Sequence, residues 1–595
     1  MRIAEAVLSI VHERGSRGLP LEDIYRQLYN PNLYLKAYGR LYRNRGALTA
    51  GATMETADAM SLAKISTIIE ALRHERYRWT PVRRTYIRKN QRSRKRRALG
   101  LPSWSDKLLQ EVIRLILEAY YEPQFSLCSH GFRPDRGCHT ALGEITKRWR
   151  GVKWYVEGDI AQCFDSFDHS VMLSILSEKL KDNRFLRLIA NLLQAGYLED
   201  WRYHATMSGV PQGSVVGPVL SNLYLDKLDK FVETVLLPTY NRGERRRVYQ
   251  PYQKLHDLYW RKRRAGQTEE ALRQQYQKLP SYDPNDPHFR RLWYVRYADD
   301  MLLGFFGPRS EAEEIKGQLR AFLREELKLE LSEEKTLITH ARTEPARFLG
   351  YHVVSLHDDT KRLRGARSIN GKTGLKVPED VIRAKCSRYM RRGLPTVLNI
   401  RTHNADYSIV AEYQAEYRGL VQYYKLAFNL HRLGQVYRVM TLSLAQTLAR
   451  KHKRSVNWVF RKYQTTVAAP HGSLKALEVR VERGEGKKPL VARFGGIELR
   501  WCKRATINDQ PGRIYNDRWN EVVSRLLADE CELCGSELNC EVHHVRKLAD
   551  LKQPGRREKP YWMKIMASRR RKTLVVCRRC HDDIHGGRIM PPHKA

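Results

Sequence analysis

The spacing of apolar positions changes along the chain and predicts regions of different secondary structure. Residues 1–80 carry apolar side chains at the intervals of an amphipathic helix, namely Ile65, Ile68, Ile69 and Leu72. Between residues 97 and 352, short β-rich runs such as 154–156 and 293–295 alternate with helical patterns. Because this alternation is typical of α/β and α+β domains, we expect a multidomain α+β fold.

Two long segments depart from this alternation. Residues 240–290 are polar and rich in Arg, Gln and Tyr, and we interpret them as a helical insertion rather than as core. Residues 377–462 are helical throughout, and one helix face carries an aromatic-rich stripe of Tyr413, Tyr417, Leu420 and Tyr424. Such a stripe is typical of core packing, and stacking on RNA bases is the alternative. Residues 470–525 mix Gly, Pro and basic residues and predict little regular structure.

The most basic segment is residues 83–97, in which nine of fifteen residues are Lys or Arg. A solvated loop is the usual fate of such a run. This run, however, lies between the strand-like residues 85–87 and Gly100. A hairpin that grips phosphate is therefore an equal alternative.

Composition narrows the classes of function. The 595 residues include 107 Lys and Arg against 65 Asp and Glu, which gives a net charge of +42. Such a chain repels itself unless an anion neutralises it, and nucleic acid is the commonest polyanion. An anionic membrane surface is the alternative, but no stretch has the uncharged apolar length of a membrane-spanning helix. Glu5 interrupts the short apolar run at the N-terminus, so we expect no signal peptide and a location inside the cell.

The ten cysteines then lie in a reducing compartment, where structural disulfides are not expected. Five of them are scattered and are typical of small buried hydrophobes: Cys128, Cys138, Cys163, Cys386 and Cys502. Two Cys-x-x-Cys pairs near the C-terminus are separated by forty-two residues and consist of Cys531 with Cys534 and Cys577 with Cys580. Four thiolates at this spacing suit tetrahedral Zn²⁺, so we predict a structural zinc site.

The sharpest local signal is Tyr297-Ala298-Asp299-Asp300, which lies between two apolar strand-like runs. A hairpin tip with two adjacent carboxylates is stable only if cations offset their repulsion. Phosphoryl transfer by two metal ions needs such a site. The motif is weak alone, but Asp159 ends another apolar strand and supplies a third carboxylate, with Phe164 five residues later.

Several motifs around these aspartates occur in a recognisable order. The central ones are Asp159-Ile160 with Phe164, then Gly209-Val210-Pro211-Gln212-Gly213, then Tyr297-Ala298-Asp299-Asp300, and in this order they resemble the palm motifs of reverse transcriptases. More specific pieces surround them at residues 99–107, 129–134, 331–336 and 347–350. Residues 416–419 and 447–452 look like a thumb and maturase region. Together these segments, from about residue 20 to the end, resemble the proteins encoded by mobile group II introns.

The resemblance implies a polymerase site with two Mg²⁺ ions. Asp159 and Asp299 would hold the ions together with the Ile160 carbonyl, and Asp300 would support the site. Phe164 would stack under the nucleotide sugar and exclude a ribose 2′-OH, with a core Phe as the alternative.

The same resemblance assigns groups to the template and the incoming dNTP. Gln212 and the glycines around it would approach both, with a tight turn as the alternative. Lys89 and Arg97 would grip the triphosphate, because fixed positive charge stabilises the departing pyrophosphate, although neighbouring basic residues could replace them. The family usually has Pro where this chain has Ala98 and Ser where it has Gly217, which leaves the fingers loop and the turn after Gln212 open.

The histidines around the two cysteine pairs resemble the HNH, or ββα-metal, nuclease motif. By this resemblance His543, His581 and His585 bind one catalytic Mg²⁺, and His544 is the general base for water. The motif often has an Asn shortly before the second cysteine pair, where this chain has Thr573, so the orientation of the base is left open. A zinc-bearing DNA-binding remnant without cleavage is the alternative.

The resemblance also implies a right-hand-like layout. We expect an RNA-binding extension at 1–80, reverse transcriptase fingers and palm at 81–355, a helical thumb and maturase region at 356–469, a DNA-binding region at 470–525 and a zinc-containing HNH module at 526–595. Because the maturase surface would precede residue 470, removal of residues 470–595 is expected to leave splicing nearly unchanged.

The implied function is reverse transcription, assistance to splicing of the host intron RNA, and nicking of target DNA during retrohoming. Expected partners are that RNA, the target DNA and dNTPs, with no membrane; a homodimer is a further candidate, and the expected location is the bacterial cytoplasm, as a ribonucleoprotein on DNA. A splicing cofactor with decayed catalytic sites is an alternative, but the candidate catalytic residues of both sites are present. A reverse transcriptase of the retron or defence type would not be expected to carry both the maturase-like and the nuclease region.

Overall fold

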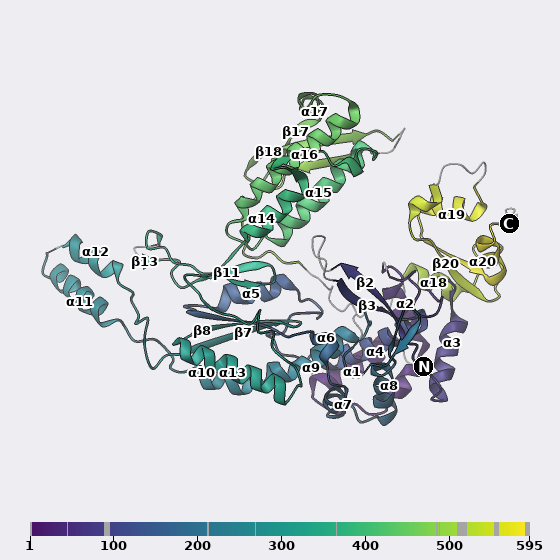
Figure 1. Cartoon of the computed structure of the whole chain (residues 1–595), viewed down its shortest axis with the longest axis horizontal. Coiled ribbons are helices and arrows are strands. Elements are labelled where there is room, and N and C mark those ends of the chain that lie inside the picture. The colour runs from purple at the N-terminus through teal and green to yellow at the C-terminus, as the bar shows by residue number, and fades with distance from the viewer. Residues whose placement is uncertain are drawn as a thin grey trace.

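The structure is a computed structural model that describes residues 3–588 except 45, 89–95, 207, 211–212, 268, 364–365, 484–485, 487, 508–519 and 553–558. The molecule is elongated, with a mixed α/β body at its centre and a helical domain standing on that body (Figure 1). A helical arm projects from one end, and the C-terminal module lies at the other end beside the N-terminal helices (Figure 1). Within the described ranges, no helix is long and apolar enough to cross a membrane.

The central sheet has four antiparallel strands in the order β7-β8-β4-β9. Its strands are β4 (Trp154–Asp159), β7 (Arg291–Tyr297), β8 (Asp300–Phe306) and β9 (Ile338–His340). Side chains alternate across the sheet, so Met301 and Leu303 belong to one hydrophobic cluster while Leu302 belongs to another. Around the sheet lie α5 (Cys138–Arg148), α9 (Gly217–Phe231) and α13 (Arg309–Glu325). The sheet is thus buried on both faces, which explains the nearly continuous apolar run of β8.

The basic run of residues 83–97 falls in a hairpin of β2 (Val82–Arg88) and β3 (Arg96–Leu101). A second sheet of order β3-β2-β5-β6 contains this hairpin together with β5 (Tyr197–Glu199) and β6 (Arg202–His204). The described residues of this segment therefore form a hairpin rather than a loop, while the grip on phosphate stays a prediction. The helices near this sheet are α4 (Trp104–Tyr121), α6 (Cys163–Ser166), α7 (His169–Ser177) and α8 (Asn183–Leu193).

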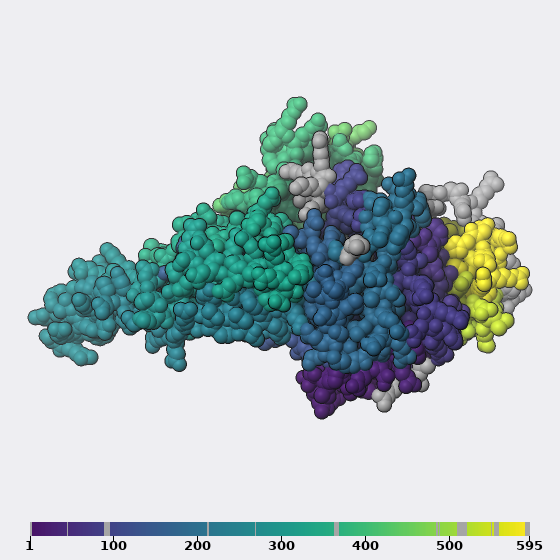
Figure 2. All heavy atoms as spheres, turned by 60° about the horizontal axis from the view of Figure 1, so that its bottom comes forward, coloured from purple at the N-terminus to yellow at the C-terminus, as the bar shows by residue number. Residues whose placement is uncertain are grey.

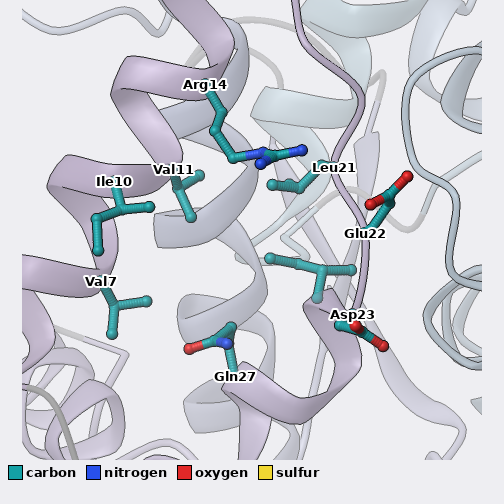
Figure 3. Close-up of a pocket in the computed structure, with 9 residues that line it drawn as sticks. Val7, Ile10, Val11, Arg14, Leu21, Glu22, Asp23 and Gln27 are labelled. Atoms are coloured by element: carbon teal, nitrogen blue, oxygen red, sulfur yellow. The ribbon is translucent and has the colours of Figure 1, made fainter.

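The N-terminal region is helical, as its apolar spacing predicts. It consists of α1 (Ala4–Ser16), α2 (Pro31–Leu41) and α3 (Leu62–Arg73), and both α1 and α2 pack against α4. A cavity of about 250 Å³ lies beside α1 and is lined by Val7, Val11, Arg14 and Leu21 among others (Figure 3). The metal-ligand clusters of the described residues lie elsewhere, so this cavity plays no part in the sites below.

The helical domain consists of α14 (Glu379–Cys386), α15 (Asp406–Tyr423), α16 (Gly434–His452) and α17 (Val456–Tyr463). Tyr413 and Tyr417 are 0% and 2% exposed, so the aromatic stripe is core and is not available for stacking on RNA. The Tyr424 hydroxyl donates to the Gly350 carbonyl at 3.0 Å and so ties this domain to the central body. Gly350 lies in the turn between β10 (Ala346–Phe348) and β11 (Tyr351–Ser355), which form a small sheet with β14 (Thr373–Lys376).

The domain boundary expected at residue 470 falls inside a β-hairpin. β17 (Gln464–Ala469) pairs with β18 (Gly472–Val481), which pairs with β19 (Leu490–Gly495). Leu477 and Phe494 of these strands join the hydrophobic cluster of α15 and α16. The packed domain therefore continues to at least residue 495, although alternate exposed positions and basic residues hid these strands in the sequence.

The segment 240–290 is a helical insertion, as expected. Its helices α11 (Gln250–Arg264) and α12 (Glu270–Lys278) pack on each other through ring contacts among Tyr252, Tyr259 and Tyr276. The short helix α10 (Leu237–Tyr240) precedes the insertion. In the space-filling view the insertion projects far from the central body (Figure 2).

The C-terminal module is a β-hairpin with helices around it. Its elements are α18 (Glu521–Ala528), β20 (Cys540–His544), α19 (Tyr561–Arg569), β21 (Thr573–Cys577) and α20 (Arg578–His585). The short strand β1 (Met60–Ser61) pairs with β20 and extends this hairpin to three strands. Apolar residues of the module and of the N-terminal helices form one hydrophobic cluster, and the two regions lie side by side (Figures 1 and 2). The module is therefore docked on the N-terminal region.

Candidate functional site

Three carboxylates meet at one end of the central sheet. Asp159, the last residue of β4, lies opposite Asp300, the first residue of β8. Asp299 precedes Asp300 in the β7–β8 turn, where Ala298 has a left-handed φ of 55°. The strand register therefore brings together the aspartates that the sequence singled out.

These carboxylates are electrostatically strained without a cation. Burial raises the pKa of Asp300 to about 7, and the neighbouring Asp299 and Asp159 carboxylates contribute. Burial also raises the pKa of Asp299, while the charges of Arg97 and Lys335 oppose that rise. A divalent cation bound between crowded carboxylates stabilises their ionised form, and Mg²⁺ prefers oxygen ligands. The site therefore fits Mg²⁺.

Lys335 is a polar group of this site that we did not assign from the sequence. Its ammonium donates to Asp159 Oδ2, and this hydrogen bond is the main cause of the raised pKa of Lys335. The nearby Ser332 N–H donates to the Asp159 carbonyl at 2.8 Å, which holds the loop of Lys335 against β4. The signal was the motif at residues 331–336, to which we gave no chemical role.

A buried ion pair supports the carboxylate turn. Arg296 on β7 and Asp229 on α9 pair with both side chains fully buried. Arg296 Nη1 also donates to the Ala298 carbonyl at 2.9 Å, and so fixes the turn that carries Asp299. A Cβ on Gly131 would lie 2.4 Å from the Ala298 backbone nitrogen, which explains why glycine occupies that position of the 129–134 motif.

The remaining polymerase predictions lie around this turn or outside the described residues. Phe164 is partly buried, and its ring lies 6.3 Å from that of Phe132 in an edge-on contact. Ile160 forms an isolated β-bridge with Leu331, close to the Lys335 loop. Arg97 lies on β3 and is exposed, and its charge acts on Asp299. Lys89 and Gln212 lie outside the described residues.

The four predicted cysteines of the C-terminal module converge. Their sulfur atoms all lie within 4.8 Å of one another, and Cys534 Sγ is 3.7 Å from Cys577 Sγ. Burial and the neighbouring sulfurs raise the pKa of the Cys580 thiol. Four crowded thiols require a cation before they ionise, so this cluster can hold a metal ion. Cys540 is not part of it, because its thiol donates to the Asp529 carbonyl at 3.2 Å.

Three predicted histidines converge at a second cluster, together with a residue that the sequence did not indicate. His543 lies on β20, while His581 and His585 lie one turn apart on α20, and their ligand atoms lie within 4.8 Å of one another and of a carboxylate oxygen of Asp58. Because Cys577 ends β21 and Cys580 lies in the first turn of α20, the cysteine cluster fixes the start of the helix that carries both histidines.

Glu541 orients His581. The Nδ1 of His581 lies 2.7 Å from Glu541 Oε1, so this nitrogen donates and Nε2 is directed to the cluster. Burial lowers the pKa of His581, but the carboxylates of Asp58 and Glu541 outweigh burial and raise it to about 9. A positive charge is thus favoured at this point of the structure. Histidine nitrogens with a carboxylate suit a divalent metal ion.

His544 faces the other side of the hairpin. Adjacent residues of a strand point in opposite directions, and the His544 ring contacts Tyr38 and Tyr42 of the N-terminal region rather than the other histidines. Its Nδ1 lies 3.2 Å from the Val542 carbonyl, which can only accept, so Nδ1 donates and Nε2 carries the lone pair. The Tyr38 hydroxyl lies 3.3 Å from that Nε2, and burial lowers the pKa of His544 to about 4.

Thr573 lies opposite His544 but does not orient its ring. Although Thr573 pairs with His544 in the hairpin register, its hydroxyl accepts from Arg525 Nη2 at 2.8 Å. The same Arg525 pairs with Glu532 at 2.8 Å. The backbone of Val542 therefore orients His544 where other HNH sequences often have an Asn.

Three family descriptions match separate parts of the chain. Residues 87–252 match "Reverse transcriptase (RNA-dependent DNA polymerase)", residues 379–489 match "Type II intron maturase", and residues 531–581 match "AI2M/AI1M-like, HNH endonuclease". The first match includes Asp159. The third match contains all four clustered cysteines and ends at His581.

Relatives match over nearly the full length. The group II intron-encoded protein LtrA of Lactococcus lactis subsp. cremoris is 37% identical over 609 residues, which cover 98% of this chain and 99% of LtrA. An uncharacterized 91 kDa protein in a cob intron of Schizosaccharomyces pombe is 32% identical over 97% of this chain and 72% of its own length. The putative COX1/OXI3 intron 1 protein of Saccharomyces cerevisiae is 30% identical over 93% of this chain and 68% of its own length. The chain therefore belongs to the group II intron-encoded proteins and combines a reverse transcriptase, an intron maturase and an HNH endonuclease.

Proposed function

We propose that this protein binds its host intron RNA, nicks one strand of a DNA target and reverse-transcribes the intron from the exposed end, as retrohoming requires. The observation that carries the polymerase part is the register of β4 and β8, which sets Asp159 opposite Asp300 with Asp299 in the adjoining turn. The histidine cluster at the end of the same molecule supports the nicking part. One chain thus offers both chemistries that target-primed synthesis needs.

Asp159 and Asp299 are the proposed ligands of the polymerase ions, with the Ile160 carbonyl, and Asp300 supports them. Two Mg²⁺ ions at this place would lower the pKa of the primer 3′-hydroxyl and stabilise the leaving oxygen. Lys335, now bonded to Asp159, neutralises that carboxylate and must release it when ligands bind. Arg296 keeps the turn in place through its bond to the Ala298 carbonyl.

The incoming dNTP is proposed to lie between this site and the β2–β3 hairpin. The exposed Arg97 acts electrostatically on Asp299, which supports a role in gripping the triphosphate. We propose Lys89 as its partner, Phe164 as the platform for the sugar and Gln212 as a template contact. The N–H of Val210, two residues before Gln212, donates to the Phe164 carbonyl at 2.7 Å. This contact supports a joint role for Phe164 and Gln212.

Zinc is the proposed occupant of the cysteine cluster, held by Cys531, Cys534, Cys577 and Cys580. A Zn–S distance of about 2.3 Å places tetrahedral thiolates roughly 3.8 Å apart. The 3.7 Å between Cys534 Sγ and Cys577 Sγ fits this geometry. The bound ion would be structural, because four cysteines leave no open position for substrate.

His543, His581 and His585 are the proposed protein ligands of a nuclease Mg²⁺ ion, and His544 is the proposed general base. A bound ion would polarise the scissile phosphate and stabilise the leaving oxygen. The tautomer of His544 supports its role, because Nδ1 donates to Val542 and Nε2 is free of a proton. To accept a proton from water, that nitrogen must first release the Tyr38 hydroxyl.

The intron RNA is the proposed main partner, bound by the N-terminal region, the basic hairpin and the helical domain. The net charge of +42 supports extensive phosphate contacts, so affinity should fall steeply with salt. The region at 470–525 is proposed to contact target DNA, and the bacterial cytoplasm is the proposed location.

Reciprocal variants of the full chain test this assignment. Asp299→Ala with Asp300→Ala should reduce cDNA synthesis to background while nicking of a DNA target continues, because the altered carboxylates lie at the end of the central sheet and the histidines lie in the C-terminal module. His581→Ala should abolish nicking yet extend a primer already annealed to intron RNA. Primer extension by the double aspartate variant would refute the polymerase assignment, and nicking by His581→Ala would refute the nuclease assignment.

A further inference from the structure

Asp58 reaches the nuclease histidines from the opposite end of the sequence, 523 residues before His581. The backbone N–H of His544 donates to Asp58 Oδ1 at 2.7 Å. The next residue, Ala59, has a left-handed φ of 60° and donates its N–H to the Val542 carbonyl at 3.1 Å. The pairing of β1 with β20 follows directly. The carboxylate is therefore fixed by backbone bonds and does not reach the site by chance on a loose loop.

The distances around Asp58 suit ligands of one ion. Asp58 Oδ1 lies 3.3 Å from His581 Nε2 and 3.5 Å from His543 Nδ1, and Asp58 Oδ2 lies 2.8 Å from His585 Nε2. The two Nε2 atoms of His581 and His585 are 3.2 Å apart. Ligand atoms about 2.1 Å from a metal ion lie roughly 3.0 Å apart in octahedral and 3.4 Å apart in tetrahedral geometry.

His543 supplies an independent sign of a missing ligand. It is 4% exposed, and neither of its ring nitrogens makes a hydrogen bond to any of the described residues. A buried imidazole without a hydrogen bond costs about 1–3 kcal/mol, which coordination of an ion would offset. Its ring is packed between Trp562, at 5.2 Å, and the rings of His581 and His585, so it cannot turn to water without rearrangement.

A carboxylate changes what this cluster can bind. Three neutral imidazoles are a weak site for a hard cation such as Mg²⁺, which prefers oxygen ligands. Asp58 adds a carboxylate oxygen to the three imidazoles, and its two oxygen atoms lie within 2.8–3.5 Å of all three histidines. Glu541 cannot take this place, because it is bonded to the far nitrogen of His581.

We propose that Asp58 is a ligand of the nuclease metal ion, so that the N-terminal region and the C-terminal module form that site together. This inference rests on the proposed role of His543, His581 and His585 as metal ligands. It implies that the nuclease is complete only while β1 is paired with β20, and that the C-terminal module alone binds the ion poorly.

Mn²⁺ binding to the full chain tests the proposal without reference to cleavage. All proteins carry Asp299→Ala and Asp300→Ala, so that the polymerase carboxylates do not add binding. Asp58→Asn should raise the dissociation constant of this site for Mn²⁺ by about tenfold or more, as measured by calorimetry or electron paramagnetic resonance. The matched control is Glu55→Gln in the same segment, because Glu55 bonds to Ser105 and Lys64 and not to the histidines; it should bind Mn²⁺ as the parent does.

The outcomes separate this proposal from the nuclease assignment. Unchanged Mn²⁺ affinity in Asp58→Asn, while His581→Ala loses binding, overturns the role of Asp58 alone. Unchanged affinity together with faster nicking also overturns it, because Asp58 would then obstruct the site. Retention of Mn²⁺ by His581→Ala as well overturns the metal site itself.

A second measurement does not depend on how Asp58→Asn folds. In the chain with native Asp58, Mn²⁺ should slow hydrogen exchange of the amides at Ala59 and His544, because their bonds hold Asp58 in place. The same addition should leave exchange unchanged in His581→Ala. Equal exchange with and without Mn²⁺ in the chain with native Asp58 would overturn the proposal.

Discussion

At the proposed polymerase site the three carboxylates lie at the ends of neighbouring strands of one sheet, whereas the residues of the proposed nuclease site come from both ends of the chain. Asp159, Asp299 and Asp300 are fixed by the β4–β8 register and by one hairpin turn. The nuclease cluster joins Asp58, which precedes β1, to histidines on β20 and α20. The first site therefore needs only its own sheet, while the second needs two distant segments to dock.

The two sites also differ in what stabilises them. Behind the polymerase turn lies the fully buried Arg296–Asp229 ion pair, and breaking such a pair costs about 3–5 kcal/mol. The proposed nuclease cluster depends instead on a small module with four clustered cysteines and on contacts such as that of Tyr38 with His544. Removing the clustered cysteines or the docking contacts should therefore affect nicking and leave polymerisation intact.

The largest difference is expected from Cys531→Ser. Because metal binding to so small a module is coupled to folding, loss of one thiolate of the proposed zinc site should remove the metal, the fold of the C-terminal module and all nicking together. Reverse transcription from an annealed primer should continue. Elemental analysis for zinc, hydrogen exchange and primer extension measure these three results.

Cys540→Ser is the matched control for this change. Cys540 is buried beside the cluster, but its thiol bonds to backbone carbonyls and not to the other cysteines. This variant should keep one zinc per chain and keep nicking. Zinc retained by Cys531→Ser, or zinc lost from Cys540→Ser, would contradict the assignment of the four ligands.

Truncation should separate the two functions next, at a different place from that suggested by the sequence. A chain that ends at residue 469 loses β18 and β19, and with them Phe494, whose ring contacts Tyr413 and Tyr417 of α15. Each large apolar side chain left exposed costs about 1.5–3 kcal/mol, so the helical domain should be destabilised and splicing lost. The packing thus argues against the expectation that removal of residues 470–595 is harmless.

A chain that ends at residue 507 is the control for the shorter one. It keeps all three strands and also the bond from Trp501 Nε1 to the Leu426 carbonyl at 3.0 Å. Splicing and reverse transcription should persist in it, and nicking should be absent. Assays of splicing with both chains decide the matter, and equal splicing by the two would refute the structural role of β18 and β19.

Local patterns explain why the convergence of the three carboxylates could be predicted from the sequence. Asp159 ends an apolar strand, and Asp299-Asp300 lie between two others. A few neighbouring residues were therefore enough to predict each strand end. The cysteine pairs and histidines were readable for the same reason. The helical segment at 240–290 followed from its polar composition, and the buried aromatic stripe followed from helical periodicity.

Asp58 could not be predicted, because nothing near it in the sequence is distinctive. It precedes a strand of only two residues, β1, whose partner β20 lies almost at the other end of the chain. Such pairing leaves no periodic pattern in one sequence. The same limit explains Tyr38, which contacts His544 from α2, and Thr573, whose bond to Arg525 depends on tertiary packing.

A smaller and more specific effect should distinguish the proposed general base from its neighbour. His544→Ala should lower the nicking rate by about 10²–10⁴-fold, the usual contribution of a general base. Tyr38→Phe keeps the ring packing but removes the hydroxyl that occupies Nε2, so it should nick at least as fast as the parent. Single-turnover nicking at saturating DNA measures both. If His544→Ala nicks normally the base is elsewhere, and if Tyr38→Phe is slower by tenfold the hydroxyl takes part in proton transfer.

The smallest expected effect isolates the docking of the two chain ends. Asn520 caps α18, because its Oδ1 accepts from the Val523 N–H at 3.1 Å, and its Nδ2 donates to the Gly39 carbonyl of α2 at 3.0 Å. Asn520→Asp keeps a good helix cap but replaces the donor to α2 with a charged acceptor, at a cost of about 1–2 kcal/mol. Hydrogen exchange at Ala59 and His544 should then quicken by about fivefold to thirtyfold, with zinc content and primer extension unchanged. Asn520→Ser, which also caps the helix and removes the amide without adding charge, should show the same direction of change. If neither variant alters exchange at these amides, docking of the C-terminal module on the N-terminal region does not depend on this contact.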